Sequence, residues 1–122
     1  MSRVVLYIED DADNVRLVER LIRRHPQAEL RVARTGQAGI ESAIACRPAL
    51  ILLDNRLPDA TGAEILRQLK AAPATGAIPV VMVSGDSGRA AADELLAIGA
   101  SEFVVKPYDI HQFLDLIARY LP

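Results

Sequence analysis

The sequence predicts an α/β fold in which one parallel β-sheet is covered by helices on both faces. Short apolar runs alternate with amphipathic helical patterns along the chain, and five such strand–helix units fit into its 122 residues. Parallel strands need helical crossovers of this kind between them. In addition, residues 50–53 form an unbroken apolar run, which is typical of a strand buried on both faces.

The first half of the chain is expected to form two strand–helix units and the central strand. Asp11 or Asp13 can cap the first helix with a side-chain oxygen, and His25-Pro26 ends it. The expected segments are a strand over 3–8, a helix to about residue 24 with Val15, Val18, Leu21 and Ile22 inward, a strand over 29–33, a helix from Thr35-Gly36 to Arg47-Pro48, and a strand over 50–53.

The second half is expected to form three helices and two strands. Thr61, Ser87 and Asp109 are the predicted caps of the helices, and Gly99 is a natural residue to end the middle one. The strands are expected over 80–83 and 103–105. The predicted inward positions are Ile65, Leu66 and Leu69 on the third helix and Ile110, Phe113, Leu114, Ile117 and Ala118 on the last.

Composition indicates a single domain over residues 1–122, without an output domain. Lys and Arg number 14 and Asp and Glu number 16, so the formal net charge of −2 points neither to nucleic acid nor to an anionic membrane. The single cysteine, Cys46, excludes an internal disulfide and is expected to be a small buried residue. The absence of a charged leader and of a long apolar run favours the cytoplasm.

Side chains with functional chemistry stand at the ends of four predicted strands. Glu9 and Asp10 follow the first strand, Asp54 the third, Ser84 the fourth and Lys106 the fifth. In a parallel sheet these ends share one edge, where open α/β sheets bind their ligands. Asp54 taken alone is explained equally well as a turn residue, but the whole set indicates a site.

The chemistry of this set favours a magnesium-dependent phosphoryl transfer. Crowded carboxylates repel one another and need a cation to stay ionised. Oxygen ligands without His or Cys suit Mg²⁺ rather than zinc. With Lys106 and Ser84 bonding the oxygens of the phosphoryl group, Asp54 is expected to attack the phosphorus in line.

Together these motifs resemble the receiver domain of two-component response regulators. The resemblance rests on Glu9-Asp10, on Asp54 followed by Leu57-Pro58 and Gly62, on Ser84 at the end of Val-Val-Met-Val-Ser, and on Lys106-Pro107 after Phe-Val-Val. It covers essentially the whole chain. It implies a flavodoxin-like, three-layer α/β/α fold with strand order 2-1-3-4-5.

The resemblance also implies a role for each matching residue. Asp54 would be the phosphoacceptor, and Lys106 would pair with the phosphoryl group, with a cis peptide bond to Pro107. Ser84 and Phe103 would be the switch pair, whose rearrangement selects partners. The implied ligands of Mg²⁺, or of Mn²⁺ in its place, are Asp10, Asp54, the backbone carbonyl of Arg56 and, through water, Glu9.

The implied partners are those of a signalling module that catalyses only its own phosphorylation and dephosphorylation. A histidine kinase or histidine phosphotransfer protein would donate the phosphoryl group at the first helix, where Arg16, Arg20 and Arg23 either meet an acidic partner or form an ordinary solvated face. An output protein or domain would bind the fourth helix, fifth strand and fifth helix. We expect no direct binding to nucleic acid or membrane, and a monomer or weak homodimer.

Two departures from the commonest pattern of the family flank the expected phosphoryl pocket. Arg56 and Asp86 have opposite charge and can pair across its mouth, which would shield an acyl phosphate from water. Gly85 is smaller than usual, so the loop after Ser84 is expected to be looser.

Two alternative functions fit part of the sequence. A haloacid-dehalogenase-like phosphatase also uses an aspartyl phosphate and Mg²⁺, and Asp11-Ala-Asp13 has its nucleophile spacing, but that nucleophile follows the first strand of a usually longer chain. A flavin-binding domain of the same topology would need a Ser-, Thr- or Gly-rich phosphate loop where Glu9, Asp10 and Asp11 stand.

Overall fold

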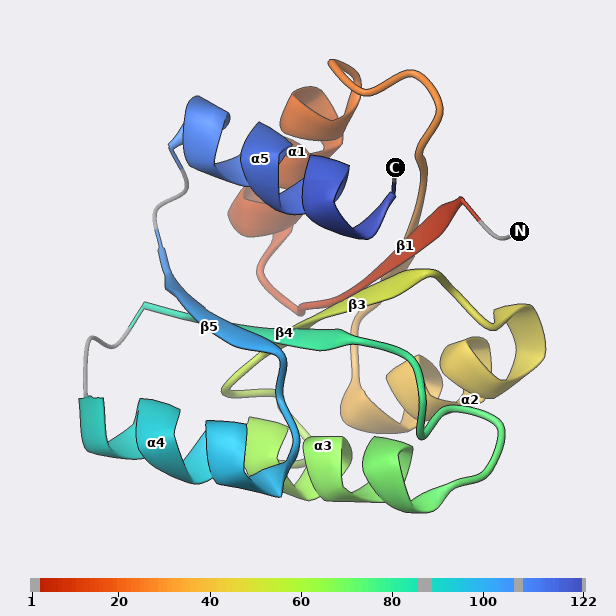
Figure 1. The fold of residues 1–122 in the computed structure, drawn as a ribbon, viewed down its shortest axis with the longest axis vertical. Helices are drawn as coiled ribbons and strands as arrows, with labels where there is room; N and C mark the ends of the chain where they lie inside the picture. The colour runs from red at the N-terminus through yellow and green to blue at the C-terminus, as the bar shows by residue number, and fades with distance from the viewer. Residues whose placement is uncertain (1–2, 86–88, 107–108, 122) are drawn as a thin grey trace.

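The computed structural model describes residues 3–85, 89–106 and 109–121, and they form one five-stranded parallel sheet with helices on both faces (Figure 1). The strands lie in the order β2-β1-β3-β4-β5. Their bounds are β1 Val4–Ile8, β2 Glu29–Ala33, β3 Leu50–Asp54, β4 Val80–Ser84 and β5 Glu102–Val105. Both the predicted fold class and the predicted strand order are confirmed.

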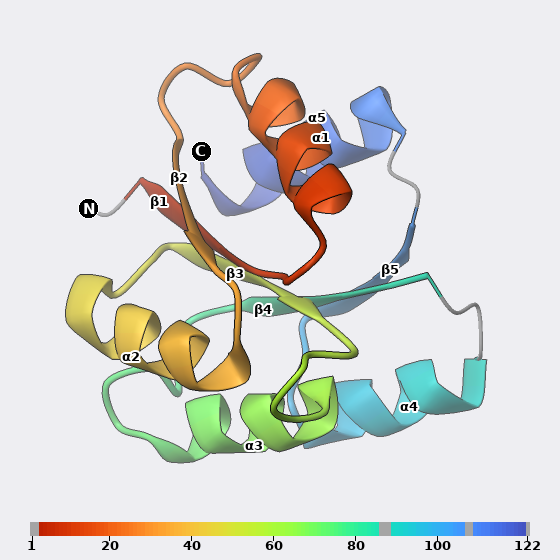
Figure 2. The same ribbon diagram turned by 180° about the vertical axis from the view of Figure 1, so that it is seen from behind.

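The helices form two layers, and each layer covers one face of the sheet. Figures 1 and 2 show α1 and α5 together on one face, and α2, α3 and α4 on the other. Their bounds are α1 Ala12–Ile22, α2 Gly36–Cys46, α3 Gly62–Ala71, α4 Arg89–Ile98 and α5 Ile110–Tyr120. Within the described ranges, no helix is long and apolar enough to cross a membrane.

Each face of the sheet has its own apolar core, because successive side chains of a strand point to opposite sides. In β1, Val5 and Tyr7 pack in the core beneath α1 and α5, whereas Leu6 and Ile8 pack in the core beneath the other helices. All four side chains are 0% exposed. The sheet is thus a rigid support from which the strand ends project.

The predicted helix caps are confirmed where the structure describes them. Asp11, rather than Asp13, caps α1, and its side chain accepts hydrogen bonds from the backbone N–H groups of Asp13 and Asn14. Thr35, Thr61 and Asp109 cap α2, α3 and α5 in the same way. Gly99, with φ of 133°, follows the last residue of α4. The remaining predicted cap, Ser87, lies outside the described residues.

Two predictions about burial are wrong. On α5, Ala118 is exposed and Ile110 and Leu114 are half-buried, while Leu116 is buried beside Phe113 and Ile117. The apolar residues of this helix allow two neighbouring helical faces, and the direction in which α5 crosses the sheet selects one of them. Cys46 is also half-buried, since it is the last residue of α2.

Candidate functional site

The ends of four strands bring the predicted site residues together at one edge of the sheet. Asp54 and Ser84 are the last residues of β3 and β4 rather than the first residues beyond them, because pairing continues to Asp54 with Val83 and to Ser84 with Val105. Glu9, Asp54 and Ser84 are 1%, 8% and 3% exposed, so the site has a buried floor. Asp10 is exposed beside them.

Lys106 joins two of these strand ends through its ammonium group. Its Nζ donates to Oδ1 of Asp54 at 3.2 Å and also to Oε1 of Glu9. The Lys106 side chain is only 13% exposed, so the pairing takes place largely away from water. A single ammonium therefore serves two buried carboxylates, which leaves excess negative charge in the cluster.

The pKa values of the two carboxylates are shifted in opposite directions. Burial raises the pKa of Asp54 to about 6, with further contributions from the hydrogen bond to Glu9 and from the charge of Glu9, while Lys106 acts in the opposite direction. Burial also acts to raise the pKa of Glu9, but hydrogen bonds from Asp54, Lys106 and Tyr7 lower it overall.

The acidic cluster has the donor chemistry that a hard divalent cation prefers. Glu9, Asp10 and Asp54 each place one carboxylate oxygen within 4.8 Å of the others. Mg²⁺ and Mn²⁺ favour such oxygen ligands. A cation would also supply the positive charge that Lys106 alone does not. The residues therefore fit the ion that the sequence predicts.

A cavity of about 400 Å³ opens above Asp54. It is lined by Asp54, Asn55, Arg56, Ser84 and Gly85. A Cβ on Gly85 would have open space around it, with nothing within 4 Å. The cavity gives a small anionic group access to the Asp54 carboxylate.

The loop after Asp54 is held in place by two residues of its own. Gly62 lies so close to β3 that an added Cβ would be 2.8 Å from the carbonyl oxygen of Asp54. Asp59 accepts hydrogen bonds from the backbone N–H groups of Gly36 at 2.7 Å and Gln37 at 3.0 Å, which ties the loop to the start of α2. These bonds to the charged form lower the pKa of the Asp59 carboxyl.

Several predicted residues lie elsewhere or outside the described part of the chain. Phe103 is half-buried on β5, opposite Met82, and faces α4 rather than the acidic cluster. Pro107 and Asp86 lie outside the described residues, so the cis peptide bond and the Arg56 pairing stay predictions. Asp11, the nucleophile of the phosphatase alternative, uses its carboxylate to cap α1.

Sequence reasoning missed Tyr7 and Asp59. The Tyr7 hydroxyl donates to Oε1 of Glu9 at 3.0 Å, although Tyr7 itself is fully buried. The spacing of Tyr7 and Glu9 could have predicted this contact, because residues two apart on a strand share a face. No comparable signal existed for Asp59, whose partners are 23 and 22 residues away.

Comparison with known proteins identifies the family. The sequence pattern of the response regulator receiver domain matches residues 5–118. The chain belongs to the response regulator receiver domain family. Receiver domains are signalling modules of two-component systems, and the predicted family resemblance is thereby confirmed.

Relatives of this receiver domain differ widely in overall length. It is 32% identical over 117 residues to the response regulator ArlR of Staphylococcus saprophyticus, and this match covers 96% of the chain but 51% of ArlR. It is 29% identical to the polar-differentiation response regulator DivK of Brucella anthropi, with 99% of the chain and 98% of DivK covered. The chain thus spans about half of ArlR and nearly all of DivK.

Solved receiver structures share the fold. The chemotaxis protein CheY4 of Vibrio cholerae superimposes with a TM-score of 0.89 over 99% of this chain and 100% of CheY4, at 22% identity. The receiver domain of the sensor histidine kinase PA1611 of Pseudomonas aeruginosa gives a TM-score of 0.87 at 21% identity, covering 98% of each chain. That structure has a magnesium ion coordinated in its active-site cleft.

Replacing Gly62 with alanine is expected to destabilise the receiver domain. The added Cβ would meet backbone atoms of Asn55 and Asp54 at 2.8 Å, so the loop must shift at a cost of about 1–3 kcal/mol. Urea unfolding measures this cost. Gly85→Ala is the matched control, because its Cβ enters open space and should leave the unfolding midpoint nearly unchanged. Equal midpoints for both variants would contradict the assigned role of Gly62.

Proposed function

We propose that this receiver domain takes a phosphoryl group from a phosphohistidine onto Asp54. The donor is a histidine kinase or a histidine phosphotransfer protein of a two-component or phosphorelay system. The observation that carries the proposal is the position of Asp54, which lies against the ammonium of Lys106 at the base of an open cavity. A buried ion pair adds little to the stability of the fold, because removing the charges from water costs about as much as their attraction gains. Such a pair is typical of a functional site.

The proposed transfer is a substitution at phosphorus. A carboxylate oxygen of Asp54 forms the new O–P bond, the P–N bond to the donor imidazole breaks, and the imidazole keeps the electron pair and takes a proton from solvent. Lys106 leaves part of its contact with Glu9 to pair with the phosphoryl oxygens. Ser84, on the neighbouring strand, donates its hydroxyl hydrogen to one of them.

The metal site proposed for this reaction consists of Glu9, Asp10, Asp54 and the backbone carbonyl of Arg56. Mg²⁺ or Mn²⁺ bound there would neutralise charge on the transferred group. Support comes from the three carboxylate oxygens within 4.8 Å and from the magnesium ion in the PA1611 receiver domain.

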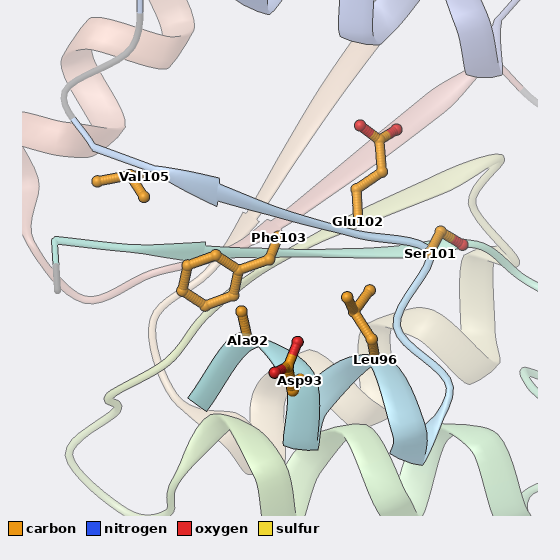
Figure 3. Close-up of a pocket in the computed structure, with 7 residues that line it drawn as sticks. All are labelled: Ala92, Asp93, Leu96, Ser101, Glu102, Phe103 and Val105. Carbon is orange, nitrogen blue, oxygen red and sulfur yellow. The ribbon is translucent and has the colours of Figure 1, made fainter. Parts of the chain in front are cut away.

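The proposed output surface is a groove between α4 and β5. Figure 3 shows the groove, which has a volume of about 480 Å³ and is lined by Ala92, Asp93, Leu96, Ser101, Glu102, Phe103 and Val105. Leu96 and Val105 are 43% and 40% exposed, which is unusual for large apolar side chains. Strand β5 links the groove to the site, because Val105 pairs with Ser84. Movement of Ser84 and Phe103 after phosphorylation would thus change a surface that a partner contacts.

The proposed phosphodonor surface includes α1, next to the acidic cluster. Arg20 and Arg23 are exposed on it, whereas Arg16 pairs with Asp13 in an exposed contact worth little. We further propose a cytoplasmic protein that binds neither nucleic acid nor membrane directly and is a monomer or weak homodimer.

Incubation with a small phosphodonor and Mg²⁺ should add roughly 80 Da to the protein, the mass of one phosphoryl group. Intact-mass spectrometry measures the adduct, which should disappear in Asp54→Asn and without Mg²⁺. Asp115→Asn is the matched control, since it alters an exposed aspartate of α5 outside the site and should still accept the group. An unmodified wild-type protein would sink the proposal.

Phosphorylation should also alter the groove between α4 and β5. In ¹H–¹⁵N spectra, the phosphodonor and Mg²⁺ should shift the amide signals of residues 92–96 and 102–106 together with those around Asp54. Asp54→Asn should abolish both sets of shifts. Shifts restricted to the phosphorylation site would show that the groove does not respond.

Arg56 is proposed to shield the acyl phosphate at the mouth of the cavity, with Asp86 as its partner. Arg56→Ala should therefore shorten the lifetime of the phosphorylated protein severalfold, as followed by the decay of the mass adduct. Arg67→Ala, which removes an exposed arginine of α3, is the control. An unchanged lifetime in Arg56→Ala would exclude the shielding role.

A further inference from the structure

We propose that Tyr7 is a positioning residue that orients Glu9 for divalent-cation binding. This inference rests on the proposed metal site and adds to it a buried residue that never touches the ion. Tyr7 and Glu9 are two residues apart and share one face of the chain at the end of β1. The phenol therefore reaches along the strand to the carboxylate.

The two oxygens of Glu9 have different surroundings. Oε1 accepts hydrogen bonds from the Tyr7 hydroxyl at 3.0 Å and from the Lys106 ammonium. Oε2 lies 3.5 Å from the backbone N–H of Asp11, on the side of the loop that carries Asp10. Two donors on Oε1 thus leave Oε2 as the oxygen that Glu9 would offer to the cation.

A carboxylate needs such restraint because rotation about its terminal torsion is nearly free. Lys106 alone is a poor restraint for Glu9, since the proposed reaction draws its ammonium to the phosphoryl group on Asp54. Tyr7 is fully buried in the core beneath α1 and α5, so its hydroxyl is fixed by packing. It is also uncharged, so it holds Glu9 without repelling a nearby cation.

Outer groups that orient metal ligands commonly change metal affinity by about ten- to a hundredfold. Tyr7→Phe removes the hydroxyl and keeps the ring that fills the core. It should weaken Mn²⁺ binding about tenfold, as measured from the EPR signal of free Mn²⁺. Circular dichroism and thermal unfolding establish that the variant is folded.

Tyr120→Phe is the matched control. It removes a phenol hydroxyl that donates to Glu102 at 2.5 Å, away from the acidic cluster, and Mn²⁺ affinity should stay unchanged. A double-mutant cycle then separates positioning from packing. In a Glu9→Gln background, Tyr7→Phe should have almost no further effect on Mn²⁺ binding, because the group it orients is gone.

The outcomes distinguish the inference from the metal site on which it rests. Tight Mn²⁺ binding by wild type, lost in Asp10→Asn, supports the site. If Tyr7→Phe then binds Mn²⁺ like wild type, or weakens binding equally in the Glu9→Gln background, Tyr7 does not position Glu9. If the wild-type protein binds no Mn²⁺, both the proposed metal site and the role of Tyr7 are contradicted.

Discussion

The contact of the Lys106 ammonium with Glu9 and Asp54 is the interaction on which the site depends. It joins the ends of three strands and brings two buried carboxylates to one cation. Because charges are costly to bury, one ammonium does not fully compensate two carboxylates. Burial, together with the neighbouring Glu9, raises the pKa of Asp54, and the unmet demand for positive charge makes the cluster suitable for a divalent cation.

The apolar cores on the two faces of the sheet compensate for the unfavourable burial of this charged cluster. The strands that end in Glu9, Asp54 and Ser84 are almost entirely buried between helix layers, so their ends cannot relax away from one another. Close packing makes such a scaffold stiff. The cost of holding like charges together is thus met by apolar burial elsewhere in the sheet.

The same stiffness connects the site to a distant surface. Ser84 pairs with Val105 and Met82 pairs with Phe103, so the end of β4 and the groove beneath α4 share a short stretch of sheet. In the proposed function, a change at Asp54 that moves Ser84 would therefore act on the strand that lines the groove. This arrangement suits a module whose chemistry serves recognition and not turnover of a metabolite.

The sequence was sufficient to predict the five strands and the set of residues at their ends, while the order of the strands came from the resemblance to receiver domains. Alternation of strand and helix patterns implies a parallel sheet, and parallel strands necessarily place their C-terminal ends on one edge. The sequence alone therefore groups Glu9, Asp54, Ser84 and Lys106 at one edge of the sheet. The cap Thr61 was predicted for a similar reason, because a cap bonds backbone only two or three residues away, whereas the sequence left the cap of the first helix open between Asp11 and Asp13.

Tertiary structure decided the features that depend on direction and on long-range contact. The buried side of α5 follows from how the helix crosses the sheet, which its own apolar pattern leaves open between Leu114 and Leu116. The bonds of Asp59 to the start of α2 join segments that meet only in the folded chain. The contact of Oε1 of Glu9 with both Tyr7 and Lys106 likewise arises only in the fold. Lys106 must reach from the end of β5, along one edge of the sheet, to a residue 97 positions earlier in the chain. Sequence spacing determines which groups share an edge, whereas packing determines which of their atoms face one another.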